Sequence, residues 1–176
     1  VDDYVETLSG IYTTGKEFTF VAWIYYRRLP WEYNCIFGQN HYPRLQYHAP
    51  SKTLDFSCRV DGVDTPFLSD TIDILKKWTH ITVISYTNDN VDFYVNGNFL
   101  NRDTHLGTLE FSDPATSPIT IATPGFPGRN WGDIIIADVL IYSRALSADE
   151  IMDIYRGYIP LDALELWLWA NRYYGN

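Results

Sequence analysis

Short hydrophobic runs separated by polar turns dominate the sequence. In residues 53–60 every second residue is apolar and those between are polar, which is the period of a strand with one face in a core and one in water. Asn96-Gly97 between two such runs predicts a tight hairpin turn. Further runs rich in aromatic and β-branched residues predict strands at 18–26, 34–39, 44–48, 78–86, 91–95, 98–100, 119–123 and 132–143.

One short helix is predicted near the C-terminal end. Ser147 and Glu150 have the spacing of a capping box. Ile151, Ile154 and Tyr155 follow at the spacing of one apolar helix face. A helix of about ten residues is marginal on its own, so this one must dock on the strands.

About ten strands and one helix predict an all-β fold, a two-sheet antiparallel sandwich with a short helix on its C-terminal side. We expect residues 1–157 to form this domain. The aromatic tail, 158–176, alternates weakly over 164–169 and is either an added edge strand or a link to a following domain. The chain opens on Val1 instead of Met, which indicates a processed chain or part of a longer protein.

Composition narrows the range of partners. The net charge of −9 repels a phosphate backbone and argues against nucleic acid. No apolar run approaches the length of a membrane span, so membrane insertion is not expected. Cys35 and Cys58 lack metal-site spacing, and they either pair as a disulfide or stay reduced in the core.

Three groups of segments together resemble one family. The hairpin of 78–83 and 93–97 carries Trp-x-His and Tyr-Val-Asn-Gly, and 138–151 carries Ile-Tyr-Ser-Arg-Ala-Leu-Ser with its following Glu-Ile. Residues 2–5 and 18–23 resemble the opening strands. Over roughly residues 1–156 the chain resembles laminin-G-like jelly rolls of the concanavalin A-like lectin/glucanase superfamily. The Phe-Asp-Gly stretch that usually precedes the first strand is missing, and the tail lies outside the usual domain.

Catalysis is not expected. The glucanase branch of the family that the chain resembles places paired carboxylates with a Glu-x-Asp-x-Glu strand, and this sequence has no such motif. Asp61 with Asp64 is better explained as a solvated turn. His80 alternates within a predicted strand and is more consistent with a structural role than with a catalytic one.

Calcium is a cofactor that the resemblance implies, because related jelly rolls often hold one structural Ca²⁺ at the rim of the sandwich. Calcium prefers hard oxygen ligands from loops. Asp138 matches a recurrent Asp of the family, although it can instead cap a turn. The candidate ligands are Asp2, Asp3, Asp133 and Asp138.

Two loop regions have the composition of a sugar-binding platform, with aromatic faces, planar polar groups and Gly or Pro. The alternative is that their aromatic residues close the ends of the sandwich or contact a partner chain. The first region offers Trp31, Tyr33, Asn40, His41, Tyr42 and Arg44, and the second offers Arg129, Asn130 and Trp131.

These observations favour a non-catalytic, lectin-like recognition module that binds a glycan or a protein surface through its rim loops. We expect it to be part of a larger protein that is extracellular or displayed on a cell or virion surface. The alternative is a structural domain of a virion or cell-surface assembly whose loops and tail contact other subunits. A glycan-active enzyme is a lesser alternative. Because function depends on sites placed on the fold, the fold alone does not choose among them.

Overall fold

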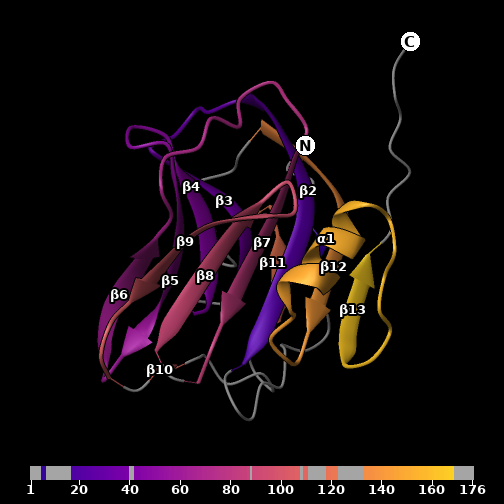
Figure 1. Cartoon of the computed structure of the whole chain (residues 1–176). Helices are drawn as coiled ribbons and strands as arrows, with labels where there is room; N and C mark the ends of the chain where they lie inside the picture. The colour runs from indigo at the N-terminus through magenta and orange to yellow at the C-terminus, as the bar shows by residue number, and fades with distance from the viewer. Residues whose placement is uncertain are drawn as a thin grey trace.

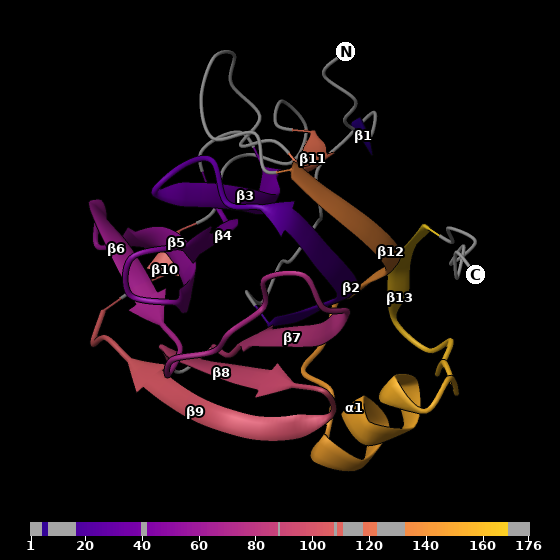
Figure 2. The same ribbon diagram turned by 90° about the horizontal axis from the view of Figure 1, so that it is seen from above.

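Two β-sheets packed face to face form the body of the protein in the computed structural model (Figure 1, Figure 2). The structure describes residues 5–6, 17–39, 42–87, 89–107, 109–110, 118–122 and 133–168. Among these residues, no helix is long and apolar enough to span a membrane.

Among the described residues, the first layer, sheet A, has seven strands and the second layer, sheet B, has six. The order of sheet A is β1 (Val5–Glu6), β11 (Ile119–Ile121), β3 (Tyr33–Gln39), β4 (Arg44–His48), β5 (Thr53–Val60) and β10 (Leu109–Glu110), and β6 (Val63–Leu68) also pairs with β5.

Sheet B forms the second layer. Its order is β13 (Leu164–Leu168), β12 (Asp133–Tyr142), β2 (Phe18–Arg28), β7 (Thr79–Ser85), β8 (Asn90–Val95) and β9 (Asn98–Thr104). Neighbouring strands in both layers are antiparallel. The predicted two-sheet jelly-roll sandwich is therefore confirmed.

The main core lies between the sheets and is rich in aromatic rings. Phe20 of sheet B lies 5.0 Å from Phe37 of sheet A, and Phe18 lies 5.7 Å from Phe56, measured between ring centroids. Such pairs add about 0.5–1.5 kcal/mol to the free energy gained from burial. The high aromatic content of the sequence thus fills the space between the layers.

Helix α1 (Ala148–Tyr155) packs on the outer face of sheet B, away from sheet A (Figure 2). Its capping box forms as predicted, because the Ser147 side chain accepts from the backbone N–H of Glu150 and the Glu150 carboxylate accepts from that of Ser147. Ile151 and Ile154 are buried. Tyr155 stacks on Trp23 with ring centroids 5.6 Å apart.

The strands differ from the sequence-based expectation in several places. β6 and the two-residue β10 were not predicted. The prediction that 53–60 turns one face to water was wrong, because Asp55 and Ser57 on its polar face are only 6% and 4% exposed. Residues 164–168 of the tail form β13, which pairs with β12 at the edge of sheet B.

Candidate functional site

The outer face of sheet A carries polar side chains along the β3–β4 hairpin. Tyr33 pairs with His48 at one end of the hairpin, and Gly38 pairs with Arg44 at the other. Five residues of strand separate the two ends, or about 16 Å at roughly 3.3 Å per residue. The residues that the sequence grouped in one loop region therefore divide between two ends of one hairpin.

We name the first end the Trp31 end, and it consists of Trp31, Glu32, Tyr33, His48 and Ser51. Trp31 is 52% exposed. The His48 ring lies 4.5 Å from the Tyr33 ring, centroid to centroid. Its Nε2 is 3.1 Å from Glu32 Oε1 and its Nδ1 is 2.5 Å from Ser51 Oγ. One imidazole is therefore held between a phenol ring, a carboxylate and a hydroxyl.

The main chain of the Trp31 end is held by hydrogen bonds to neighbouring segments. The Asn34 side-chain amide donates to Trp31 O at 2.7 Å. The backbone N–H of Ala49 donates to Glu32 O at 2.8 Å. These bonds fix two consecutive carbonyls, so the exposed indole projects from an ordered segment and not from a free loop.

We name the second end the Arg44 end, and it consists of Tyr42, Arg44, Arg59 and Asp64. The Arg44 guanidinium carbon lies 5.9 Å from the centroid of the Tyr42 ring. Burial and a hydrogen bond to Asp64 raise the pKa of the Tyr42 phenol to about 12. Arg59 Nε is 3.4 Å from Asp64 Oδ1. The Asp64 carboxylate thus interacts with both Tyr42 and Arg59.

Between the two ends the polar residues of the face are buried. Gln46, Asp55 and Ser57 lie opposite the core, and Ser57 Oγ donates to Asp55 Oδ1 at 2.6 Å. Burial raises the pKa of Asp55, while the Ser57 hydrogen bond and the charges of Arg44 and His48 oppose that rise. Of the residues named on this face, Tyr33, His48 and Arg44 at its ends are partly exposed.

Two of the four candidate calcium ligands, Asp133 and Asp138, lie on β12. Both Asp133 oxygens accept at 2.7 Å, one from Arg27 Nε and one from Arg28 Nε, and these bonds lower the pKa of the carboxyl. A cation at Asp133 would have to compete with two guanidinium groups. Asp138 has a positive φ of 49° where the β12–β2 register shifts.

No group of three or more metal-ligating His, Cys, Asp or Glu side chains occurs among the residues described. The two other candidate calcium ligands, Asp2 and Asp3, lie outside them. Calcium therefore stays a prediction. The ligand-site candidates Asn40, His41, Arg129, Asn130 and Trp131 also fall outside the described part of the chain.

Cys35 and Cys58 are not joined in a disulfide, and both are buried. Cys35 Sγ lies within hydrogen-bond distance of Phe37 O (3.6 Å) and Leu45 O (3.9 Å). Burial raises the pKa of the Cys35 thiol, so its reactive thiolate form is disfavoured. Neither thiol has the exposure that a reactive cysteine needs.

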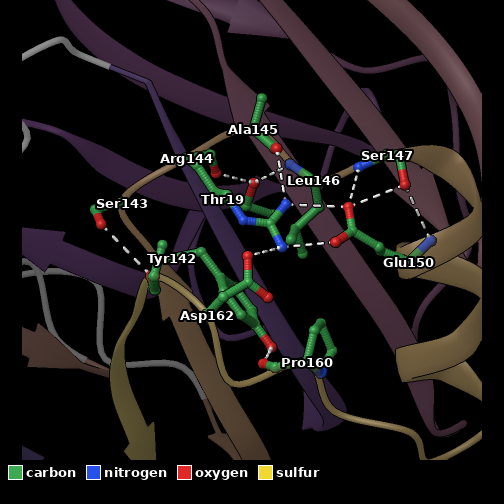
Figure 3. A network of polar contacts seen from close by, with 11 residues as sticks. Thr19, Tyr142, Ser143, Arg144, Ala145, Leu146, Ser147, Glu150, Pro160 and Asp162 are labelled. Carbon is green, nitrogen blue, oxygen red and sulfur yellow. Dashed lines mark hydrogen bonds and ion pairs between the residues drawn. The ribbon is translucent and has the colours of Figure 1, made fainter.

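The motif that ends β12 and begins α1 has a structural role (Figure 3). The Arg144 guanidinium contacts the Glu150 carboxylate at 3.0 and 2.6 Å and Asp162 at 2.8 Å, and it also donates to Ala145 O at 3.3 Å. The Tyr142 hydroxyl donates to Pro160 O at 3.1 Å. These contacts fasten the strand, the helix and the tail to one another.

Sequence reasoning missed part of the polar face. It named Trp31 and Tyr33 but not His48, Asp55 or Ser57. The register of β3, β4 and β5 brings these residues together, and only that register could have revealed them.

Comparison with known proteins places the fold. The family model of the concanavalin A-like lectin/glucanases superfamily matches residues 1–152. No curated protein matches the sequence significantly.

Three solved structures of the same fold show how far the likeness extends. A Bacteroides ovatus protein described as a candidate carbohydrate-binding protein is 18% identical with a TM-score of 0.70, covering 94% of this chain and 49% of its own. The binding domain of botulinum neurotoxin DC, in complex with rat synaptotagmin II, is 16% identical with a TM-score of 0.62, covering 82% and 36%. The Trypanosoma rangeli sialidase is 19% identical with a TM-score of 0.55, covering 81% and 23%.

The chain spans half or less of these three proteins, and at such identities the likeness concerns the fold alone. The family match supports the resemblance seen in the sequence more strongly, because the matched region contains the hairpin, the closing strand and the start of the helix on which that resemblance is based. With residues 1–152 matched, the chain belongs to the concanavalin A-like lectin/glucanases superfamily.

Proposed function

We propose that this protein is a non-catalytic recognition module that binds carbohydrate at the Trp31 end. The observation that carries the proposal is the geometry of that end. An indole that is 52% exposed stands on a hydrogen-bonded segment beside the Glu32–His48 pair. An aromatic face can cover the apolar C–H patch of a sugar ring, and the neighbouring polar groups can read its hydroxyls.

Each polar group of the Trp31 end has a defined part in this proposal. The Glu32 carboxylate is exposed and accepts hydrogen bonds from sugar hydroxyls. His48 orients that carboxylate through its Nε2 atom. The His48 ring is itself held in place, because it packs against Tyr33 and its Nδ1 atom contacts Ser51. Such support from neighbouring residues is what makes a binding site selective.

The proposal is for binding without chemistry. Ordinary glycoside hydrolysis needs two carboxyl groups that flank the scissile bond. The Trp31 end, as defined by its five residues, has one carboxyl group, that of Glu32. Related folds include a candidate carbohydrate-binding protein and the binding domain of a toxin, which supports recognition, and they also include a sialidase. A setting outside the cell or on a particle surface is part of the proposal, because glycans and protein receptors are displayed there.

A glycan array followed by calorimetry on the best ligand tests the proposal. Trp31→Ala should raise Kd at least about tenfold, which corresponds to about 1.4 kcal/mol. Trp31→Phe, which keeps an aromatic face, should lose less. Trp167→Ala is the matched control, because this Trp is 47% exposed on β13 and lies outside the proposed site. Unchanged affinity of Trp31→Ala, or an equal loss in Trp167→Ala, would rule out the Trp31 end.

A second candidate function is subunit contact within a surface assembly. It is favoured by β13, an edge strand of sheet B on which Trp167 is exposed. Edge strands offer unpaired backbone groups to another chain. Light scattering during size-exclusion chromatography would detect self-association, and Trp167→Ala should weaken it. A monomer at high concentration would count against contacts between copies of this chain.

A further inference from the structure

Arg44 is a partly exposed charged side chain with one buried donor that is not satisfied. Its Nε is buried and makes no hydrogen bond. Within the part of the chain that the structure describes, no hydrogen bond or ion pair of the guanidinium is found, and its contact is with the ring of Tyr42. A guanidinium has five N–H donors in a planar fork.

Leaving the buried Nε without an acceptor has a cost. A partly buried charged donor loses hydration and regains nothing unless an acceptor replaces the water. The nearby carboxylates are already engaged. Asp64 serves Tyr42 and Arg59, and Asp55 accepts from Ser57.

From this geometry we infer that Arg44 binds the carboxylate or sulfate group of an acidic sugar, at the opposite end of the β3–β4 hairpin from Trp31. The inference rests on the proposed carbohydrate-binding function and names its ligand class. The planar fork of an arginine matches a carboxylate or sulfate through two parallel N–H···O bonds. The Tyr42 ring beneath the guanidinium holds its plane in place.

We assign the ligand to acidic sugars and not to acidic peptides because the proposed function is carbohydrate binding. The two ends of the hairpin lie about 16 Å apart, at roughly 3.3 Å for each of five strand residues. An extended oligosaccharide can therefore reach both the exposed indole and the guanidinium. The protein carries a net charge of −9 and repels polyanions in general, so binding requires one local contact and not a charged surface.

Calorimetry with oligogalacturonate and with the matching neutral galacto-oligosaccharide provides the test. The wild type should bind the acidic chain more tightly. Arg44→Gln should lower the affinity for the acidic oligosaccharide about tenfold or more. It should leave the affinity for the neutral one nearly unchanged, since only the charge-assisted hydrogen bonds are lost. Arg44→Lys keeps the charge without the fork and should lose part of the affinity. Arg59→Gln is the matched control, because it removes the same charge at the same end from a side chain paired with Asp64.

Each outcome decides the inference. Equal losses in Arg44→Gln and Arg59→Gln would mean general attraction, and equal binding of both oligosaccharides by the wild type would mean no anion site. Either result overturns the inference and leaves the proposed function standing. A hexaglutamate peptide bound as tightly as the oligogalacturonate would overturn the assignment to sugars.

If neither oligosaccharide binds, the proposed function fails, and sulfate alone still tests the anion site. At low millimolar concentration, sulfate should raise the Tm of the wild type and of Arg59→Gln more than chloride does. Arg44→Gln should show no such difference. A Tm response that is the same in all three proteins would overturn the site. Should Arg44→Gln not fold, Arg44→Lys replaces it, and its sulfate response should be smaller than that of Arg59→Gln.

Discussion

Arg144 and Glu150 face each other with two hydrogen bonds, Nη1 to Oε2 at 3.0 Å and Nη2 to Oε1 at 2.6 Å. The same carboxylate accepts from the backbone N–H of Ser147 at 2.8 Å and so completes the capping box of α1. The same guanidinium contacts Asp162 in the segment before β13. One ion pair therefore holds the end of β12, the start of α1 and the tail (Figure 3).

Substitution of Glu150 should destabilise the fold. Glu150→Gln keeps the capping hydrogen bond but loses the ion pair, and should lower the free energy of unfolding by about 1 kcal/mol. Glu150→Ala loses both and should cost about 2 kcal/mol. Asp149→Asn, one residue away and with no ion pair among the described contacts, should cost about 0.5 kcal/mol or less. Urea denaturation measures all three, and equal effects at 149 and 150 would show that Arg144 adds nothing.

The stability that Glu150 provides should depend on pH. Arg144 and the Ser147 hydrogen bonds lower the pKa of Glu150 in the folded protein from 4.5 to about 2. A carboxyl whose pKa falls on folding stabilises the protein above its unfolded pKa, and this contribution is lost as the pH falls through its folded pKa. The Tm difference between the wild type and Glu150→Gln should be full near neutral pH and shrink between pH 4.5 and about 2. A constant difference across that window would contradict this assignment.

Most of the fold could be predicted from the sequence because its signals are local. The apolar runs gave nearly all the strands of sheet B, and Ser147 and Glu150 marked the start of the helix. Asn96 and Gly97 have φ values of 51° and 78°, as a type I′ turn requires. β6 was missed because Pro66 and its polar neighbours argue against a strand, although pairing with β5 forms one.

The candidate site was harder to predict because its contacts join separate segments. Composition singled out Trp31, but nothing local indicates that His48 supports Glu32 from 16 residues away. The alternating pattern predicts that Asp55 and Ser57 face solvent, because it cannot show that the Ser57 hydroxyl donates a hydrogen bond to the Asp55 carboxylate. Arg144 presented the same difficulty, since its spacing to Asp149 and to Glu150 differs by one residue and only the helix geometry chooses between them.

Gly107 should not tolerate a side chain. Its φ is +143°, and a Cβ there would lie 2.4 Å from Val60 Cγ1 and 2.6 Å from Asp61 Oδ2. The Asp61 side chain can move, but Val60 is packed in the core at the end of β5. Gly107→Ala should therefore lower the free energy of unfolding by about 2–4 kcal/mol.

Gly62→Ala separates crowding from backbone strain. Gly62 also has a positive φ, +79°, but no atom of the described residues lies within 4 Å of the point that a Cβ would occupy. Its substitution should cost only about 1 kcal/mol, from the left-handed backbone. Denaturation of the two variants by urea makes the comparison, and similar losses would show that contact with Val60 is not the cause.

Asn101 joins the edges of the two sheets and should matter more than its partly exposed position suggests. Its Oδ1 accepts from the backbone N–H of Asp70 at 2.8 Å, and its Nδ2 donates to Leu68 O at 3.1 Å. One side chain on β9 thus provides hydrogen-bond partners for two backbone groups at the end of β6, the Asp70 N–H and the Leu68 carbonyl. Asn101→Ala should cost about 1–2 kcal/mol, because two backbone groups lose their partners.

Hydrogen exchange gives this prediction a local readout. The Asp70 amide should exchange faster in Asn101→Ala, because its acceptor is gone, while the amides of β7 in the middle of sheet B should stay protected. Asn98→Ala is the control on the same strand, since Asn98 bonds only to the nearby Asn96 O among the contacts described. Unchanged exchange at Asp70 would mean that water replaces the Asn101 side chain without loss, and that core packing and the bond from the Leu68 N–H to Asp103 Oδ2 hold the two sheet edges together.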